Sequence, residues 1–299
     1  MIRPSYLKKG ATVAIVSTAR KVSKKELLPA LEILKKWGLK VVLGKSIEAE
    51  EHQFAGNDEL RTFDFQTMLD DPSINAIWCA RGGYGTVRII DQLDFTNFKY
   101  HPKWIIGYSD VTVLHSHINN LGLETLHAQM PVSIETKSEA TINSLNKTLF
   151  GEDYSIEIKT DHNNVQGIAS GQLVGGNLSI LYSLCGSSSA INTKGKILFI
   201  EDLDEYLYHI DRILQNLKRN GMFEGLEGLI VGGMTQMHDN DIPFGSSAKE
   251  IILNTCSEYN FPIVFNFPAG HLEDNRALIL GRKTDLMVHK NGVTLSFKE

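Results

Sequence analysis

A serine placed between an apolar run and a helical pattern could act as a catalytic nucleophile. Ser109 stands in Gly-Tyr-Ser-Asp, directly after the apolar segment 104–106. A serine at a sharp turn from strand to helix projects its hydroxyl beyond the sheet, beside the free N–H groups of the helix N-terminus. Those N–H groups and the helix dipole would stabilise the oxyanion of an acyl transfer. The alternative is that Ser109 only caps the helix, since serine is a preferred N-cap residue.

A glycine-rich turn follows the preceding apolar run, with the sequence Arg-Gly-Gly-Tyr-Gly at 81–85. Glycines let backbone N–H groups approach a bound group closely, because no side chain intervenes. The spacing matches neither GxGxxG nor GxxxxGK, so nucleotide binding is only weakly indicated. A second oxyanion donor beside Ser109 is another interpretation, because both loops would leave the same edge of a parallel sheet. A tight turn is the commonest explanation of the glycines taken alone.

Glu201 and His271 each follow a further apolar run and could complete the chemistry. Glu201 is the first polar residue after the segment 196–200, and an acidic loop continues from it. Acidic clusters at strand ends bind divalent metals, but no histidine here has the spacing of a metal site. His271 ends Pro-Ala-Gly-His, and a histidine can accept and return a proton at neutral pH. A lone histidine is more often structural or exposed, and an acidic loop is often merely solvated.

The elements that must position these residues alternate between strand and helix in the first half of the chain. Strands are expected at 12–17, 40–43, 76–79 and 104–106, and helices at 24–37, 57–70 and 86–93. The first helix begins at the capping box Ser23-Lys-Lys-Glu26, and Asn57 caps the second. Such alternation favours a parallel sheet covered by helices on both faces.

The pattern breaks into polar residues at 146–166, and we predict the domain boundary there. Beyond it, the apolar pattern predicts strands at 196–200, 228–231 and 262–265, with helices at 206–220 and 246–259. The helix 206–220 carries isoleucine and leucine on one stripe, which is typical of a helix packed on a core. The chain then ends in a hairpin with its turn at Asn291-Gly292.

Composition excludes several classes of protein. The chain has 299 residues and a net charge of −5, which argues against non-specific binding of nucleic acid. Its three cysteines form no CxxC pair, so neither a zinc ribbon nor a disulfide framework is indicated. No segment approaches the length of about 18 apolar residues that a membrane span needs. The expectation is a cytoplasmic protein without a membrane partner.

Together the segments resemble the LD-carboxypeptidase family, which includes muropeptide LD-carboxypeptidases and microcin-immunity peptidases. The matching stretches occur in the family's order: RGGYG at 81–85, GYSD at 107–110, GQLVGGNL at 171–178, IED at 200–202 and PAGH at 268–271. One departure is His-Ala-Gln-Met at 127–130, where the family usually has His-Gly-Pro-Met. The family's loop shape therefore does not carry over to that segment.

The resemblance implies a serine peptidase with a Ser–Glu–His triad. Ser109 would be the nucleophile, His271 the base and Glu201 the orienting carboxylate. Oxyanion donors would be the backbone N–H of Asp110 and that of a glycine in the 81–85 turn, for which we favour Gly83 without separating it from Gly82. The family uses no metal and no other cofactor, and its members usually form homodimers.

The fold that the resemblance and the alternating elements predict is α/β. A Rossmann-like parallel-sheet domain at 1–150 would carry the nucleophile. A smaller α/β domain at 167–299 would carry the glutamate and the histidine, with the active site between the two.

The implied reaction is hydrolysis of the bond between the L-centre of a diamino acid and a terminal D-alanine in muropeptides, during peptidoglycan recycling. The acidic loop 201–205, running into Tyr-His-Ile-Asp-Arg at 208–212, looks like the muropeptide branch of the family. One alternative is cleavage of peptidyl-nucleotide conjugates, as in the microcin-immunity branch. Another is a non-catalytic peptide-binding protein of the same fold, which would need no base and no orienting acid.

A carboxypeptidase must also bind a free carboxylate, and burying that anion without a partner would be costly. An arginine fork holds a carboxylate through two parallel hydrogen bonds. Two arginines lie close to the predicted site in the sequence, Arg81 and Arg276. We favour Arg81 because its turn leaves the same sheet edge as Ser109; pairing of Arg81 with a structural carboxylate is the alternative.

Overall fold

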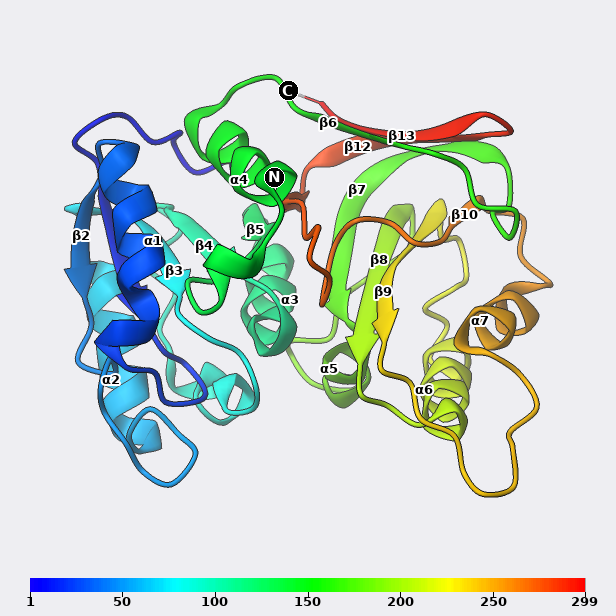
Figure 1. Ribbon diagram of the computed structural model, residues 1–299, viewed down its shortest axis with the longest axis horizontal. Coiled ribbons are helices and arrows are strands. Elements are labelled where there is room, and N and C mark those ends of the chain that lie inside the picture. Colours follow the sequence, from blue (N-terminus) through cyan, green and yellow to red (C-terminus); the bar gives the residue numbers. More distant parts are fainter. Residues whose placement is uncertain (299) are drawn as a thin grey trace.

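The computed structural model describes residues 1–298 as two sheets that stand side by side, each with its own helices (Figure 1). The first sheet has the order β11-β5-β4-β3-β1-β2 and the second β10-β9-β8-β7-β12-β13-β6. The two-domain α/β fold predicted from the sequence is confirmed.

The first sheet is parallel except at one edge. Its strands are β1 (Thr12–Val16), β2 (Lys40–Leu43), β3 (Ile74–Cys79), β4 (Trp104–Gly107), β5 (Thr125–His127) and, antiparallel to β5, β11 (Leu278–Leu280). The order 2-1-3-4-5 is a doubly wound arrangement, in which ligands bind beyond the carboxyl ends of β1 and β3. Those ends are therefore where the loops that carry chemistry should converge.

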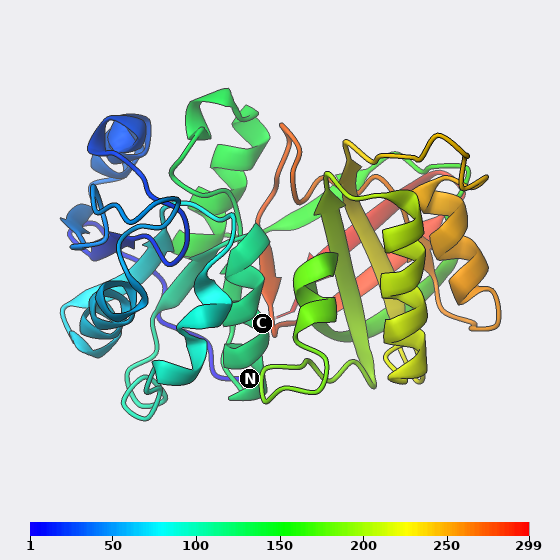
Figure 2. The same ribbon diagram turned by 90° about the horizontal axis from the view of Figure 1, so that it is seen from below.

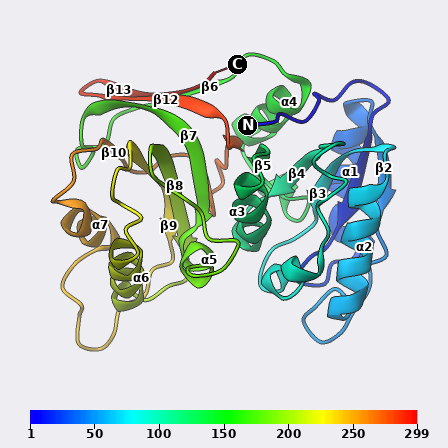
Figure 3. The ribbon, with the colours of Figure 1, turned by 180° about the vertical axis from the view of Figure 1, so that it is seen from behind.

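Helices cover both faces of the first sheet, because its strands carry apolar side chains on both faces. Val13 and Ile15 of β1 share a core with α1 (Lys24–Lys36), whereas Ala14 and Val16 share a core with α2 (Asp58–Asp70). Figure 3, from behind, shows α1 and α2 beside the strands. Both predicted starts are confirmed, since Ser23 forms a capping box with Glu26 and Asn57 accepts from the N–H of Leu60.

The helix predicted at 86–93 is wrong. The structure has two short 3₁₀ turns there, Thr86–Arg88 and Ile90–Gln92. Neither turn has a side-chain cap, and the backbone of Gly85 packs so closely that an added β-carbon would lie 2.9 Å from Ala19 Cα. This close packing of the preceding loop and the lack of a cap leave no start for an α-helix.

The second sheet is parallel on one side and antiparallel on the other. Its strands are β6 (Ser155–Ile158), β7 (Gly167–Asn177), β8 (Lys196–Leu203), β9 (Gly228–Thr235), β10 (Ile263–Val264), β12 (Lys283–His289) and β13 (Gly292–Phe297). The run from β10 to β7 is parallel, and β12, β13 and β6 continue it antiparallel. The polar stretch 146–166, in which we predict the domain boundary, thus contains β6.

Helices α5 (Leu178–Ser183), α6 (Leu207–Arg219) and α7 (Ala248–Cys256) accompany the parallel part of this sheet (Figure 2). The predicted stripe of α6 is confirmed, because its isoleucines and leucines are fully buried: Ile210, Ile213, Leu214 and Leu217. The final hairpin is also present, but its two-residue turn is Lys290-Asn291, since His289 pairs with Gly292. The predicted turn was one residue too late.

The two sheets meet through the helix that follows the predicted nucleophile. Helix α3 (Thr112–Asn120) packs against β7 and α5. The Thr112 hydroxyl accepts the N–H of Asn177 at 2.9 Å, and a β-carbon on Gly176 would lie 2.4 Å from that hydroxyl oxygen. A glycine at 176 is therefore required for this approach. The end of helix α4 (Glu139–Phe150) contacts the segment before β1, because the N–H of Leu7 donates to the carbonyl oxygen of Leu149 at 2.8 Å. Over residues 1–298, the structure has no helix of the length and apolar character that would cross a membrane.

His115 lies in helix α3, and its burial makes the stability of the fold depend on pH. It is fully buried in α3, and its Nε2 donates to the carbonyl oxygen of Gly107 at 2.9 Å. Burial lowers the pKa of His115 to about 4. The unfolded chain binds this proton more readily, so stability is fully present above pH 6.5 and is lost as the pH falls toward 4.

We expect His115→Gln to flatten the acid dependence of stability. Each pH unit below 6.5 should cost the wild type about 1.4 kcal/mol through this one group. The measurement is urea unfolding at pH 7, 6 and 5, with His162→Gln as the matched control because the His162 side chain is 90% exposed. Parallel pH dependences for wild type and His115→Gln would contradict this account.

Candidate active site

Ser109 sits on a strained turn at the carboxyl end of β4. All residues of β4 are buried, and Ser109 opens a 3₁₀ turn, Ser109–Val111, that runs into α3. Its φ is +62°, a left-handed conformation that a serine adopts at an energetic cost. The turn also needs Gly107, because a β-carbon there would lie 2.8 Å from Val111 Cγ2. Such strained elbows expose a nucleophile above the sheet.

Unpaired backbone N–H groups surround this serine. A β-carbon on Gly82 would lie 3.2 Å from Ser109 Oγ, so the glycine turn packs directly against the nucleophile turn. Within residues 1–298, the N–H groups of Gly82, Gly83 and Asp110 donate no hydrogen bond to another group. These N–H groups are free to receive an oxyanion, which is the arrangement that acyl transfer needs.

The side chain of Asp110 ties the two turns together. It is buried, and its Oδ2 accepts the N–H of Thr86 at 2.8 Å. Burial raises the pKa of Asp110, while the hydrogen bonds from Thr86 oppose that rise. The side chain of Asp110 therefore has a structural role, beside any role of its backbone N–H.

Glu201 fixes the position of His271 through two hydrogen bonds. Glu201 is fully buried near the end of β8, and its Oε2 accepts the Nδ1–H of His271 at 2.6 Å and the backbone N–H of His271 at 3.2 Å. Gly270, with φ +101°, is required here, since a β-carbon would lie 2.6 Å from Glu201 Oε2. With Nδ1 engaged, Nε2 is left as the basic nitrogen of the ring.

Ser109 and His271 line one cleft between the two domains, with a volume of about 500 Å³. The ring of Tyr108 packs against His271 with the centroids 4.9 Å apart. Over the described chain, no hydrogen bond yet joins Ser109 Oγ to His271, and such catalytic contacts often tighten only when substrate binds. The geometry suits a nucleophile and a base that act on a group placed between them.

The two arginines predicted from the sequence have different surroundings. Arg81 lines the cleft, and its Nη1 donates to Glu26 Oε1 and to the carbonyl oxygen of Lys21, both at 3.4 Å. Arg276 is held by Asp274 through hydrogen bonds of 2.9 to 3.1 Å and does not line the cleft. Of these two arginines, only Arg81 is in a position to meet a ligand in this cleft.

Sequence reasoning noted the acidic loop 201–205 but missed two positively charged residues of the cleft. Arg20 and Lys137 lie in it with Arg81, and Asp204 and Glu205 add acidic side chains. Lys137 donates to the carbonyl oxygen of Leu272 at 2.7 Å, and burial lowers its pKa. Arg20 could have been found from the expectation that the loop after the first strand reaches the same sheet edge. Lys137 gave no comparable signal.

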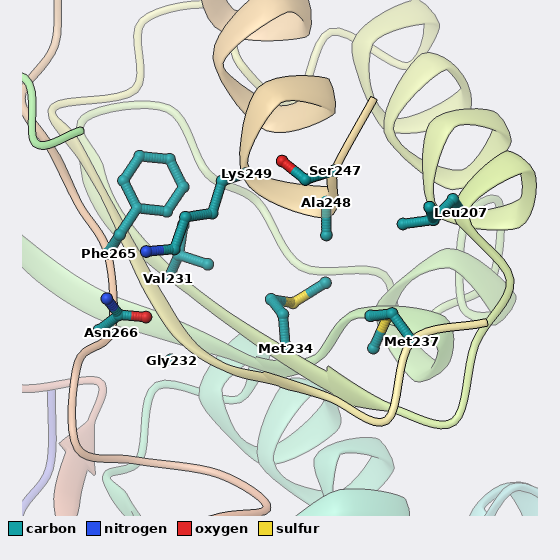
Figure 4. A pocket seen from close by; sticks show the side chains of 10 residues that line it. All are labelled: Leu207, Val231, Gly232, Met234, Met237, Ser247, Ala248, Lys249, Phe265 and Asn266. Carbon is teal, nitrogen blue, oxygen red and sulfur yellow. The ribbon is translucent and has the colours of Figure 1, made fainter. Parts of the chain in front are cut away.

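A second cavity, of about 380 Å³, lies beside α6 and α7 and has a different character (Figure 4). Apolar side chains, Met234, Met237 and Phe265 among them, form most of its lining. Ser247 is engaged in the capping box of α7, and Lys249 pairs with Asp161 at 3.0 Å. Its two polar side chains that could take part in acyl transfer are thus engaged elsewhere, in contrast to Ser109 and His271 of the cleft.

No group of three or more His, Cys, Asp or Glu side chains is arranged to hold a metal ion anywhere in residues 1–298. The acidic residues in the last part of β8 and directly after it instead accept hydrogen bonds. Asp202 accepts from Asn177, at 2.9 Å, and from Ser179. Glu205 accepts from Ser179 at 3.0 Å and contacts His209. These contacts account for the acidic run without a metal.

The models of one known protein family match the two domains of this chain separately. A model of the LD-carboxypeptidase N-terminal domain matches residues 13–128, and one of the LD-carboxypeptidase C-terminal domain matches residues 170–286. The probable murein peptide carboxypeptidase of Bacillus subtilis is 37% identical over 94% of this chain and 90% of that protein.

Two further relatives cover nearly the whole chain. The crystal structure of muramoyltetrapeptide carboxypeptidase from Oxalobacter formigenes aligns with a TM-score of 0.87 and 26% identity, over 96% of this chain and 99% of that chain. The microcin C7 self-immunity protein MccF of Escherichia coli is 25% identical over 96% of this chain and 93% of that protein.

From the geometry of the site we expect a fluorophosphonate probe to label Ser109, because such a probe reacts with an activated serine hydroxyl. Glu201→Gln should slow labelling on the order of 100-fold or more, since the amide favours the wrong imidazole tautomer. Labelling rates and the modified peptide are read by mass spectrometry. Glu205→Gln is the matched control, a carboxylate in the same cleft that does not contact His271. Equal rates for both variants would show that Glu201 does not orient the base.

Proposed function

The chain belongs to the LD-carboxypeptidase family, and on this premise we propose that it is a serine carboxypeptidase that removes a terminal D-alanine from muropeptides. The bond cleaved would join that D-alanine to the L-centre of a diamino acid, during peptidoglycan recycling. The observation that carries the proposal is the buried hydrogen bond from His271 to Glu201, at the edge of the cleft that Ser109 also lines.

The geometry supports a two-step acyl transfer. His271 Nε2 takes the proton of the Ser109 hydroxyl as Oγ attacks the scissile carbonyl carbon, while Glu201 stabilises the imidazolium. The negative charge that forms on the carbonyl oxygen is received by backbone N–H groups, for which Asp110 and Gly83 are the proposed donors. His271 then returns its proton to the leaving amine of D-alanine. Water, deprotonated in the same way, releases the acyl group from Ser109.

A cation in the cleft is part of the proposal, because the substrate ends in a free carboxylate. Arg81 and Arg276 are the candidates from the sequence, and the contacts of Arg276 with Asp274 outside the cleft favour Arg81 between these two. We propose no metal and no cofactor, because acyl transfer by this set of residues needs neither.

A cytoplasmic location is proposed from the composition and the cysteine pattern of the sequence, and a homodimer from the family resemblance. Muropeptides of the recycling route are the small peptide substrates expected there, and no nucleic acid or membrane partner is proposed. Light scattering after size-exclusion chromatography would test the homodimer, and a monomer at micromolar concentration would count against it.

We expect the protein to release D-alanine from an LD-tetrapeptide, and Ser109→Ala to lower turnover more than roughly a thousandfold. His271→Ala should lose a comparable amount, and the double variant should be no slower than either, because the two act as one unit. Released residues from a panel of muropeptides and one aspartyl-nucleotide conjugate are identified by mass.

Several outcomes would change the assignment. Preferred cleavage of the nucleotide conjugate would move the chain to microcin-immunity chemistry, and binding without cleavage of any compound would make it a peptide-binding protein. Ser109→Ala activity within tenfold of wild type would remove Ser109 from the mechanism. Turnover that EDTA abolishes and a divalent ion restores would indicate a metal requirement.

A further inference from the structure

We infer that Arg20, a residue outside the family motifs, binds the terminal carboxylate of the peptide substrate. The inference rests on the proposed carboxypeptidase function and names the group that would give it specificity for a free chain end. Arg20 lines the same cleft as Ser109 and His271.

Arg20 occupies the position in the first sheet where ligands bind to doubly wound folds. It lies on the loop after β1, whereas the glycine turn follows β3 and Ser109 follows β4. Strands β1, β3 and β4 are consecutive neighbours in the sheet. The carboxyl ends of β1 and β3 form the switch point of this strand order, at which the helices leave toward opposite faces.

The backbone of Arg20 is fixed although its side chain is exposed. Its carbonyl oxygen accepts the Ser17 hydroxyl at 2.6 Å, and Arg20 forms a bridge with Phe54. The flanking residue Lys21 donates its N–H to the carbonyl oxygen of Gln53 at 3.0 Å. The guanidinium therefore extends from an anchored point, which lowers the entropy lost when it binds an anion.

The glycine turn makes room for the stem of Arg20. A β-carbon on Gly83 would lie 2.6 Å from Arg20 Cδ and 2.7 Å from Arg20 Nε. One residue earlier, a β-carbon on Gly82 would lie 3.2 Å from Ser109 Oγ. Two adjacent glycines thus place the arginine and the nucleophile on either side of one short turn.

The guanidinium of Arg20 has no partner among residues 1–298, in contrast to the other cations of the cleft. Arg81 contacts Glu26, and Lys137 donates to the carbonyl oxygen of Leu272. Lys21, the neighbour of Arg20, pairs with Glu50. A carboxylate ligand would have to compete for these cations, whereas the fork of Arg20 is available for two parallel hydrogen bonds.

The chemistry of the substrate requires the carboxylate site to adjoin the nucleophile. In a peptide with one residue beyond the scissile bond, only the amide nitrogen and one Cα separate the scissile carbonyl from the terminal carboxylate. The carboxylate must therefore lie within about one residue's span, 3.8 Å, of the carbon that Ser109 attacks. Arg20 lies across the glycine turn from Ser109 in the same cleft, whereas Arg276 does not line that cleft.

The test compares Arg20→Gln with wild type on an LD-tetrapeptide that ends in free D-alanine and on the same peptide ending in D-alaninamide. For the acid we expect KM to rise roughly 10- to 100-fold, the loss of a hydrogen-bonded charge pair. For the amide we expect little change. Arg20→Lys should restore part of the affinity for the acid, since it keeps the charge but not the fork.

The controls separate failure of this inference from failure of the proposed function. Lys21→Gln removes the adjacent charge outside the cleft and should leave both substrates unaffected, and thermal unfolding checks that each variant folds. Equal losses on acid and amide, or an acid-specific loss in Arg81→Gln but not in Arg20→Gln, would overturn the role of Arg20 while the carboxypeptidase stands. Wild-type protein that cleaves no tetrapeptide would overturn both.

Discussion

The hydrogen bond from the N–H of Asn177 to the Thr112 hydroxyl fixes the geometry on which the site depends. Thr112 begins the helix after the nucleophile turn, and Asn177 ends β7, the neighbour of the strand that carries Glu201. The contact is possible because Gly176 lacks a side chain where Thr112 approaches. This contact therefore links the turn that carries Ser109 to the strand pair that carries Glu201.

Burial of Glu201 is the second constraint, and it explains the close packing around the histidine. A carboxylate removed from water is costly unless hydrogen-bond donors compensate for the lost solvation. His271 supplies two such donors to Oε2, its ring Nδ1–H and its backbone N–H. The same contacts set the tautomer of the ring, whereas Glu201 Oε1 is buried without a hydrogen-bond partner among residues 1–298.

The sequence predicts the place of a site residue best where that residue follows a long apolar run. Ser109 stands just past the end of the buried strand β4, and Glu201 lies in β8, which continues to Leu203 beyond the apolar run that ends at Ile200. Arg20 was missed because its importance depends on β1 lying beside β3, which no local pattern contains. The three-residue strand β11 was missed for a similar reason, since its periodicity is too short to detect. The helix predicted at 86–93 is absent because the close packing at Gly85 outweighs the local preference for a helix.

Strand β11 has a consequence for how the molecule is made. It completes the first sheet at the edge of β5, yet it lies some 150 residues later in the chain, between strands of the second sheet. A ribosome that has synthesised the first domain therefore leaves the edge of β5 unpaired, and such an open edge can pair with other chains. His271 also emerges only shortly before β11. The first sheet is therefore closed only after the chain has passed through most of the second sheet and through His271, so completion of one domain depends on synthesis of the other.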